Sequence, residues 1–232
     1  MDINFAKFEE KASISFKDKN LLRQAFTHRS YINENKNTKF EHNERLEFLG
    51  DAVLELVVTN FLYEKYPNKP EGELTTYRSA LVNSITLAEV ASNLTMNDYL
   101  LLSKGEAKDT GRARQYILAN TFEAVTGALY LDQGYDNAKA FIEKHIFVFA
   151  DQMIAKGNLV DAKSQFQEKA QEKTGTTPSY KLVREAGPDH DKSFTVGVMI
   201  GKDQIAVGEG KSKQEAEQNA ALKALEAKGW SL

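Results

Sequence analysis

The sequence has no cysteine among its 232 residues, which excludes disulfide bonds, thiolate zinc sites and a cysteine nucleophile. It has no apolar run near the roughly 18 residues that a membrane-spanning helix needs. Residues 1–19 mix charged and apolar side chains and lack the unbroken apolar centre of a signal peptide. We therefore expect a cytoplasmic protein that does not associate with a membrane.

The sequence also lacks a strong excess of either charge. Its 30 lysines and arginines face 33 aspartates and glutamates, and residues 161–232 carry 11 of each. Composition alone therefore does not predict nucleic-acid binding. The content of 41% apolar and 27% charged residues is typical of a globular protein, and the length fits one large domain or two modest ones at about 150 residues each.

Helical periodicity dominates the first two-thirds of the chain, where apolar residues recur at spacings of three and four. Glycine and proline interrupt the pattern at 67–70 and 104–114. The pattern predicts helices over 20–33, 44–66, 74–93, 117–133 and 137–155.

The pattern changes beyond residue 160. Apolar and polar residues alternate at 180–185 and 193–200, which predicts strands, with a third short strand at 204–207. Helical spacing flanks them at 161–173 and 212–228, and Ser212 with Glu215 forms a capping box. The sequence therefore predicts an all-α domain over 1–155, a linker at 156–160, and a small α+β domain of order α-β-β-β-α over 161–232.

An acidic stripe runs along the predicted helix at 44–66. Glu44, Glu47 and Asp51 fall within about 60° of one another around the helix axis, and Glu55 joins them. The other positions are mostly apolar, so we expect core around the rest of this helix. Such a stripe is either a solvated helix face or a site for a hard divalent cation, which prefers carboxylate oxygens.

A second predicted helix offers partners for that stripe. Asn120 and Glu123 lie one turn apart, among the small residues Ala119, Ala124, Gly127 and Ala128. Small residues permit close helix packing, so a crossing here would bring Asn120 and Glu123 to the acidic stripe. Spacing alone does not establish that crossing.

These motifs resemble the ribonuclease III family over nearly the whole chain. The family's hallmark is matched by NERLEFLGDAVLELVV at 43–58, and further matches are THRSYINE at 27–34, PEGELTTYRSALVN at 70–83, the segment 103–135, and DAKSQFQEKAQ at 161–171. The resemblance implies a homodimeric, all-helical endonuclease domain followed by a double-stranded-RNA-binding domain. It implies cleavage of duplex RNA to 5′-phosphate and 3′-hydroxyl ends, in the processing of ribosomal and messenger RNA precursors.

The resemblance also assigns site residues. The ligands of Mg²⁺, with Mn²⁺ as an alternative ion, would be Glu47, Asp51, Asn120 and Glu123. Asp51 and Glu123 would also be catalytic, together with Glu44 and Glu71 as accessory acidic residues. Phe48 resembles the aromatic residue that enters a socket on the partner subunit, although an ordinary core position is an equal alternative.

Asn120 departs from the family, which usually has aspartate there. An amide oxygen can still ligate Mg²⁺, but it removes one negative charge, so metal binding should weaken. Three alternatives follow: a natural active variant with lower metal affinity, an engineered change that traps substrate, or a duplex-RNA-binding protein that keeps the nuclease fold without activity. We favour an active enzyme, because the other acidic positions are all present.

In the second domain, the resemblance assigns Gln167 and Glu168 to one RNA minor groove and His190, in the loop at 187–190, to the next. Lys211 and Lys213 would meet the phosphates between them, at the start of the last helix. Gln214 stands where relatives often carry a further basic residue, so affinity should be modest. A helical interaction scaffold without an RNA role is disfavoured by this set of residues.

Two arginines precede the second acidic helix. Arg112 and Arg114 lie in the glycine-containing segment at 104–114. They are either phosphate contacts or residues of a solvated loop.

Overall fold

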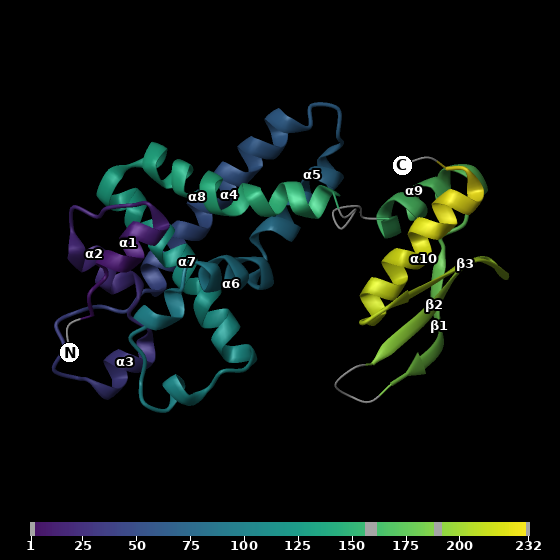
Figure 1. Cartoon of the computed structure of the whole chain (residues 1–232). Coiled ribbons are helices and arrows are strands. Elements are labelled where there is room, and N and C mark those ends of the chain that lie inside the picture. The colour runs from purple at the N-terminus through teal and green to yellow at the C-terminus, as the bar shows by residue number, and fades with distance from the viewer. Residues whose placement is uncertain (1–2, 156–161, 188–191, 231–232) are drawn as a thin grey trace. The chain divides into compact units, whose positions relative to one another are not determined.

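The computed structural model describes residues 3–155, 162–187 and 192–230 (Figure 1). Packing divides the chain into two compact units, Met1–Leu159 and Val160–Leu232, and each is described by itself. The first is helical and the second has the order α-β-β-β-α, so the predicted fold class is confirmed. Within the described part of the chain, no helix combines the length and apolar character needed to cross a bilayer.

The first unit contains eight α-helices and two short 3₁₀-helices in its described residues. Their bounds are α1 Ala6–Ala12, α2 Lys19–Ala25, α3 Arg29–Glu34, α4 Glu44–Lys65, α5 Glu71–Val82, α6 Ser84–Asn93, η1 Met96–Tyr99, η2 Glu106–Lys108, α7 Arg112–Gln133 and α8 Tyr135–Ala155. The sequence pattern missed α1, because seven residues are too few to establish a helical period.

Two predicted helices are each split in the structure. The segment at 20–33 breaks after α2, where Thr27 forms a parallel bridge with Leu101. The segment at 74–93 breaks at Asn83, whose ψ of 160° is extended. The Asn83 side chain then accepts hydrogen bonds from the backbone N–H groups of Ile85 and Thr86 and caps α6. A capping residue ends the helical backbone conformation, but the spacing of the apolar residues on either side of it continues.

The core of the first unit is built around the crossing of α4 and α7, each 22 residues long. At the crossing, a Cβ atom on Gly50 would overlap the carbonyl oxygen of Glu123, and one on Gly127 would overlap the carbonyl oxygen of Leu46. Ala124 and Ala128 beside them are fully buried. The close crossing expected from small residues is therefore confirmed, and it fixes the position of α4 along the axis of α7.

One face of α4 is not covered by core. Phe48 is 81% exposed, Leu56 58% and Tyr63 72%. These three residues fall within about 80° of one another around the helix, and we call them the apolar stripe. The expectation that core surrounds the rest of α4 is wrong on this face.

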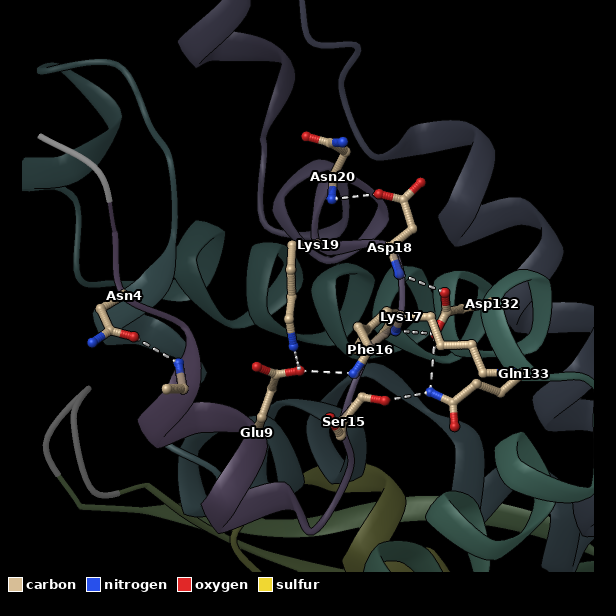
Figure 2. A network of polar contacts seen from close by, with 11 residues as sticks. Asn4, Glu9, Ser15, Phe16, Lys17, Asp18, Lys19, Asn20, Asp132 and Gln133 are labelled. Atoms are coloured by element: carbon tan, nitrogen blue, oxygen red, sulfur yellow. Dashed lines mark hydrogen bonds and ion pairs between the residues drawn. The ribbon is translucent and has the colours of Figure 1, made fainter.

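A polar network holds the segment before α2 against α1 and the end of α7 (Figure 2). The Glu9 carboxylate accepts hydrogen bonds from the Phe16 backbone N–H at 2.7 Å and from Lys19 Nζ at 2.6 Å. Asp132, near the end of α7, accepts from the backbone N–H groups of Lys17 and Asp18, both at 2.8 Å. These contacts anchor α7 at the end remote from Asn120.

The second unit packs α9 (Ala162–Thr174) and α10 (Lys213–Lys228) with an antiparallel sheet of order β1-β2-β3 (Figure 1). The strands are β1 Ser179–Ala186, β2 Ser193–Ile200 and β3 Asp203–Gly210. The buried side chains of Phe166, Val198 and Leu225 form the core with alanines of α10. Ser212 caps α10 as predicted, since the Glu215 backbone N–H donates to Ser212 Oγ at 3.1 Å, and the Glu215 carboxylate reaches back to accept from the Lys211 backbone N–H at 2.7 Å.

Candidate functional site

The crossing of α4 and α7 brings four predicted ligands into one neighbourhood. Glu47 and Asp51 come from α4, and Asn120 and Glu123 from α7. The Asn120 side chain hydrogen-bonds the Glu47 carboxylate, and the Glu123 carboxylate interacts electrostatically with both Asp51 and Glu47. The expected convergence of the two helices is therefore present in the structure.

Burial and like charge make this cluster unfavourable without a counter-charge. Burial, followed by the negative charges of Asp51 and Glu47, raises the pKa of Glu123 to about 8. Burial and neighbouring Glu44 also raise the pKa of Glu47, against the hydrogen bond from Asn120, which lowers it. Burial and then Glu55 raise the pKa of Asp51. The pKa of each of the three carboxyl groups is thus raised, and that of Glu123, the most buried of them, is raised furthest.

The donor chemistry of the cluster suits a hard divalent cation. All four side chains offer carboxylate or amide oxygen, the ligand type that Mg²⁺ prefers. As they stand, however, no three acidic or histidine side chains in the described ranges lie close enough together to hold an ion. An ion here would bind through retained water molecules or draw the carboxylates inward, and Mg²⁺ usually keeps several of its waters.

A pocket of about 360 Å³ opens directly beside the cluster. Glu47 and Asn120 line it from the cluster side, and Glu44 lies on its wall. The remaining lining residues are His28, Arg29, Asn43, Tyr116 and Ile117. Sequence reasoning missed Arg29 and Tyr116, because their place in the pocket depends on segments almost 90 residues apart meeting in space.

Glu44 lies at the edge of the cluster, exposed on the first turn of α4. Its carboxylate forms an ion pair with the Arg29 guanidinium at 3.4 Å, and its second oxygen lies 3.8 Å from His42 Nδ1. It also interacts with Glu47 through charge. Its position is therefore compatible with the accessory role that the family resemblance implies.

Glu71 lies elsewhere within its own chain. It begins α5 and lines a different pocket, of about 390 Å³, together with Thr59, Tyr63 and Arg78. Its carboxylate accepts a hydrogen bond from Thr75 Oγ1 at 2.9 Å. The structure of one chain therefore does not bring Glu71 to the carboxylate cluster.

The two arginines Arg112 and Arg114 lie in the first turn of α7 and make different contacts. Arg114 donates to Asn97 Oδ1 at 2.8 Å and to the Glu106 carbonyl oxygen at 2.7 Å, so it holds the loop before α7. The alternative of a solvated loop residue is wrong for it, whereas a phosphate contact stays a prediction. Arg112 is exposed at the start of α7, and its guanidinium donates to the Tyr116 hydroxyl at 3.3 Å.

Phe48 is on the surface rather than in the core. Its exposure of 81% contradicts the alternative of an ordinary core position. The ring projects from α4, where it begins the apolar stripe. A role of Phe48 at a subunit interface stays a prediction.

The predicted RNA-binding residues of the second unit are on its surface. Gln167 and Glu168 are exposed on α9, and Lys211 and Lys213 are exposed at the start of α10; His190 lies outside the described residues. Phe194 pairs with Gly210 in the sheet, and Lys213 Nζ lies 5.8 Å from the Phe194 ring centre. The start of α10 is therefore at the end of the sheet where β2 begins.

Comparisons with known proteins agree with this architecture. A family model described as Ribonuclease-III-like matches residues 18–149, and one described as a double-stranded RNA binding motif matches 162–228. The chain is 46% identical to Ribonuclease 3 of Bacillus licheniformis over 95% of its length and 88% of that protein. It is 48% identical to Ribonuclease 3 of Enterococcus faecalis over 94% of its length and 95% of that protein.

A solved structure is similar to the first unit. The nuclease domain of ribonuclease III from Campylobacter jejuni matches with a TM-score of 0.55 and 42% identity, over 61% of this chain and 98% of that domain. That domain was described for structural flexibility in a region involved in dimer formation.

Proposed function

The chain belongs to the ribonuclease III family as a double-strand-specific endoribonuclease, and we propose that the α4–α7 cluster is its metal-dependent active site. One observation carries this proposal: Glu123 of α7 is coupled by charge to both Asp51 and Glu47 of α4. Carboxylates from two helices face one another here, and a bound cation would offset the repulsion between them.

The proposed ligands are Glu47, Asp51, Asn120 and Glu123, and the proposed ion is Mg²⁺, with Mn²⁺ as a substitute. When bound, such an ion supplies an activated water and stabilises the charge that develops on the phosphate. The carboxylates orient and neutralise the ion. Glu123 holds a proton in the metal-free site at neutral pH, because its pKa lies at about 8, and it must release that proton when it ligates.

The substrate and products follow the family. Hydrolysis at the 3′-oxygen side of the phosphate leaves a 5′-phosphate and a 3′-hydroxyl, and the proposed substrates are precursors of ribosomal and messenger RNA in the cytoplasm. In the second unit, Gln167 and Glu168 are proposed to meet one minor groove, His190 the next, and Lys211 and Lys213 the phosphates between them. A-form RNA presents this shape largely without regard to sequence.

A cleavage assay tests the active site. Long duplex RNA is incubated with the chain across a Mg²⁺ titration, with Glu47→Gln and Asp51→Asn as variants and exposed Glu89→Gln of α6 as the matched control. We expect cleavage that requires the ion, is lost in both variants and is retained in the control. A band shift without cleavage at any metal concentration would instead establish a binding protein.

We also propose that the apolar stripe is the homodimer interface. Phe48 and Tyr63 are 15 residues apart, about 22 Å along α4, and Leu56 lies near their midpoint. A two-fold axis beside Leu56 would place Phe48 of each chain at the Tyr63 end of the other, where the pocket that contains Glu71 opens. An isologous interface requires this kind of self-complementarity.

The same arrangement accounts for Glu71. At the Tyr63 end of α4, Glu71 would face the first turns of the other chain's α4, where the carboxylate cluster begins. Each active site would then combine the cluster of one chain with the accessory Glu71 of its partner.

Sedimentation of Phe48→Ala tests the interface, with Val148→Ala, an exposed apolar position on α8, as control. We expect monomers for the first variant and dimers for the second.

A further inference from the structure

The pocket beside the carboxylate cluster has features that the metal site does not use. It measures about 360 Å³, within the range of pockets that hold small ligands. Its walls come from α3, the start of α4 and α7. Because Glu47 and Asn120 belong to both the cluster and the pocket, the pocket directly adjoins the place where a strand would be cut.

Among the residues that line the pocket, Arg29 is the one arginine or lysine, and it lies beside Glu44 and Glu47. Arg29 begins α3, its side chain is 66% exposed, and it reaches the Glu44 carboxylate at 3.4 Å. Exposed ion pairs of this kind stabilise by about 0–1 kcal/mol, so exchange for another anion is inexpensive. A guanidinium binds phosphate oxygens in a bidentate, charge-assisted manner, which makes Arg29 suited to a backbone phosphate.

The backbone beneath Arg29 is firmly held. The His28 backbone N–H donates to the Leu101 carbonyl at 3.0 Å, and Ser30 Oγ accepts from the Ser103 backbone N–H at 3.1 Å. Asn43, buried in the pocket wall, donates to the Ala25 carbonyl at 3.1 Å. The guanidinium therefore extends from a fixed base, so its reach into the pocket is limited to its own side-chain rotamers.

Tyr116 provides a second kind of contact. Its hydroxyl accepts a hydrogen bond from Arg112 at 3.3 Å, which uses an oxygen lone pair and leaves the hydroxyl hydrogen to be donated elsewhere. The ring is partly exposed on α7, one turn before Asn120. A hydroxyl donor one helical turn from Asn120 is complementary to a ribose 2′-oxygen, the group that distinguishes RNA from DNA.

From this geometry we propose that the pocket is a subsite for the ribose–phosphate unit next to the scissile phosphate. Arg29 binds its phosphate, and the Tyr116 hydroxyl donates to its 2′-oxygen. This inference rests on the proposed function, because it takes duplex RNA as the substrate. It adds a substrate-positioning arginine and a tyrosine that selects ribose over deoxyribose at one nucleotide.

The Tyr116 contact can be tested by removing each partner separately. Duplexes carrying a single 2′-deoxy nucleotide at successive positions around a mapped cut site are cleaved by the wild type and by Tyr116→Phe. We expect one position at which the 2′-deoxy change lowers kcat/KM roughly three- to tenfold for the wild type and has no further effect on Tyr116→Phe. Equal effects on both proteins at every position would overturn the assignment of Tyr116.

The Arg29 contact has a binding readout. Affinity for duplex RNA is measured against salt in a Glu123→Gln background, which prevents cleavage from confusing the result. We expect Arg29→Gln to reduce the log–log salt slope by about 1, Arg29→Lys to keep the slope with weaker binding, and exposed Lys11→Gln of α1 to match the parent. A slope for Arg29→Gln equal to that of Lys11→Gln would refute the phosphate contact. If the wild type with Mg²⁺ cut no duplex at all, the proposed function itself would fail.

Discussion

Gly50 of α4 and Gly127 of α7 meet backbone to backbone, and this contact sets the distance between the helices that carry the candidate ligands. A Cβ on either residue would overlap a carbonyl oxygen of the other helix. Side chains one turn away on each helix are Glu47 and Glu123. The separation of the carboxylates is therefore set by two residues that have no side chain.

The first prediction concerns this crossing. Gly50→Ala or Gly127→Ala should force α4 and α7 apart, because the obstacle is backbone rather than a flexible side chain. We expect a loss of about 1–3 kcal/mol of stability or more, together with weaker metal binding by the protein that remains folded. Thermal unfolding with and without Mg²⁺ measures both effects.

A matched glycine controls for helix propensity. Gly72 of α5 has open space around its Cβ position, so Gly72→Ala should be neutral or stabilising by a few tenths to about 1 kcal/mol. If all three variants behaved alike, the close approach of the two helices would not be what positions the site.

The second prediction concerns Asn120. Asn120→Asp adds a fourth carboxylate to a cluster in which Glu123 is already difficult to ionise. The variant should melt at a lower temperature in chelator, gain more stability than the wild type on adding Mg²⁺, and cut duplex RNA faster at limiting Mg²⁺. Coincident metal titrations of the two proteins would argue that Asn120 is not a ligand.

The third prediction uses the pKa of Glu123. That pKa rises from an ordinary 4.5 to about 8 through burial and then through Asp51 and Glu47. Between these values the folded protein keeps a proton that the unfolded chain has released, so the free energy of unfolding falls as pH rises from about 4.5 to about 8. Glu123→Gln resembles the protonated carboxyl and should escape this loss.

The measurement is metal-free thermal unfolding against pH. Glu123→Gln should match the wild type near pH 4.5 and exceed its stability near pH 8 by up to about 5 kcal/mol, since a pKa change of one corresponds to about 1.4 kcal/mol. In the wild type, Mg²⁺ should bind more tightly as pH rises toward 8 and should release a proton on binding. Calorimetry in two buffers of different ionisation enthalpy detects that proton, and a pH-independent metal affinity would contradict the assignment.

The fourth prediction concerns Asp132. Burial tends to raise its pKa, but hydrogen bonds from the backbone N–H groups of Lys17 and Asp18 outweigh that effect and lower it. Its contribution is therefore present above the unfolded pKa near 3.8 and is lost as pH falls through the lower folded value. Asp132→Asn should lower the melting temperature at neutral pH, and the difference from the wild type should shrink in acid. Glu10→Gln, an exposed carboxylate of α1, should show neither effect.

The fifth prediction concerns the second unit. Gln214→Lys should tighten duplex-RNA binding and steepen its log–log salt slope by about 1, whereas Lys213→Gln should do the reverse. Lys202 lies in the turn between β2 and β3, at the opposite end of the sheet from the start of α10, so Lys202→Gln should change little. Filter binding at several salt concentrations compares the three variants, and equal slopes would place the RNA elsewhere.

The fold was largely predictable because the local spacing of apolar residues is sufficient to identify most of its helices and strands. The long spans of α4 and α7 and the three strands follow from apolar spacing, and the start of α10 from its Ser212–Glu215 capping box. The breaks at 26–28 and at Asn83 were not visible, because a capping residue changes the backbone while the apolar rhythm continues on either side.

The candidate site was only half predictable for a related reason. Glu47 and Asp51 share a helix face, so spacing alone aligns them. The small residues of the predicted helix at 117–133 indicated a close crossing with the acidic helix. The exposure of Phe48 and the pocket between Arg29 and Tyr116 depend on which segments meet in space. Glu71 illustrates the same limit, since within one chain it lines a different pocket from the one beside the carboxylate cluster.

The apolar stripe of α4 also matters before the enzyme ever meets RNA. In a single folded chain, Phe48, Leu56 and Tyr63 are exposed to solvent. An exposed apolar surface of this kind promotes aggregation and recognition by chaperones and proteases. Under the proposed homodimer, a second copy covers this stripe, and the time for which it stays exposed then depends on the concentration of the chain.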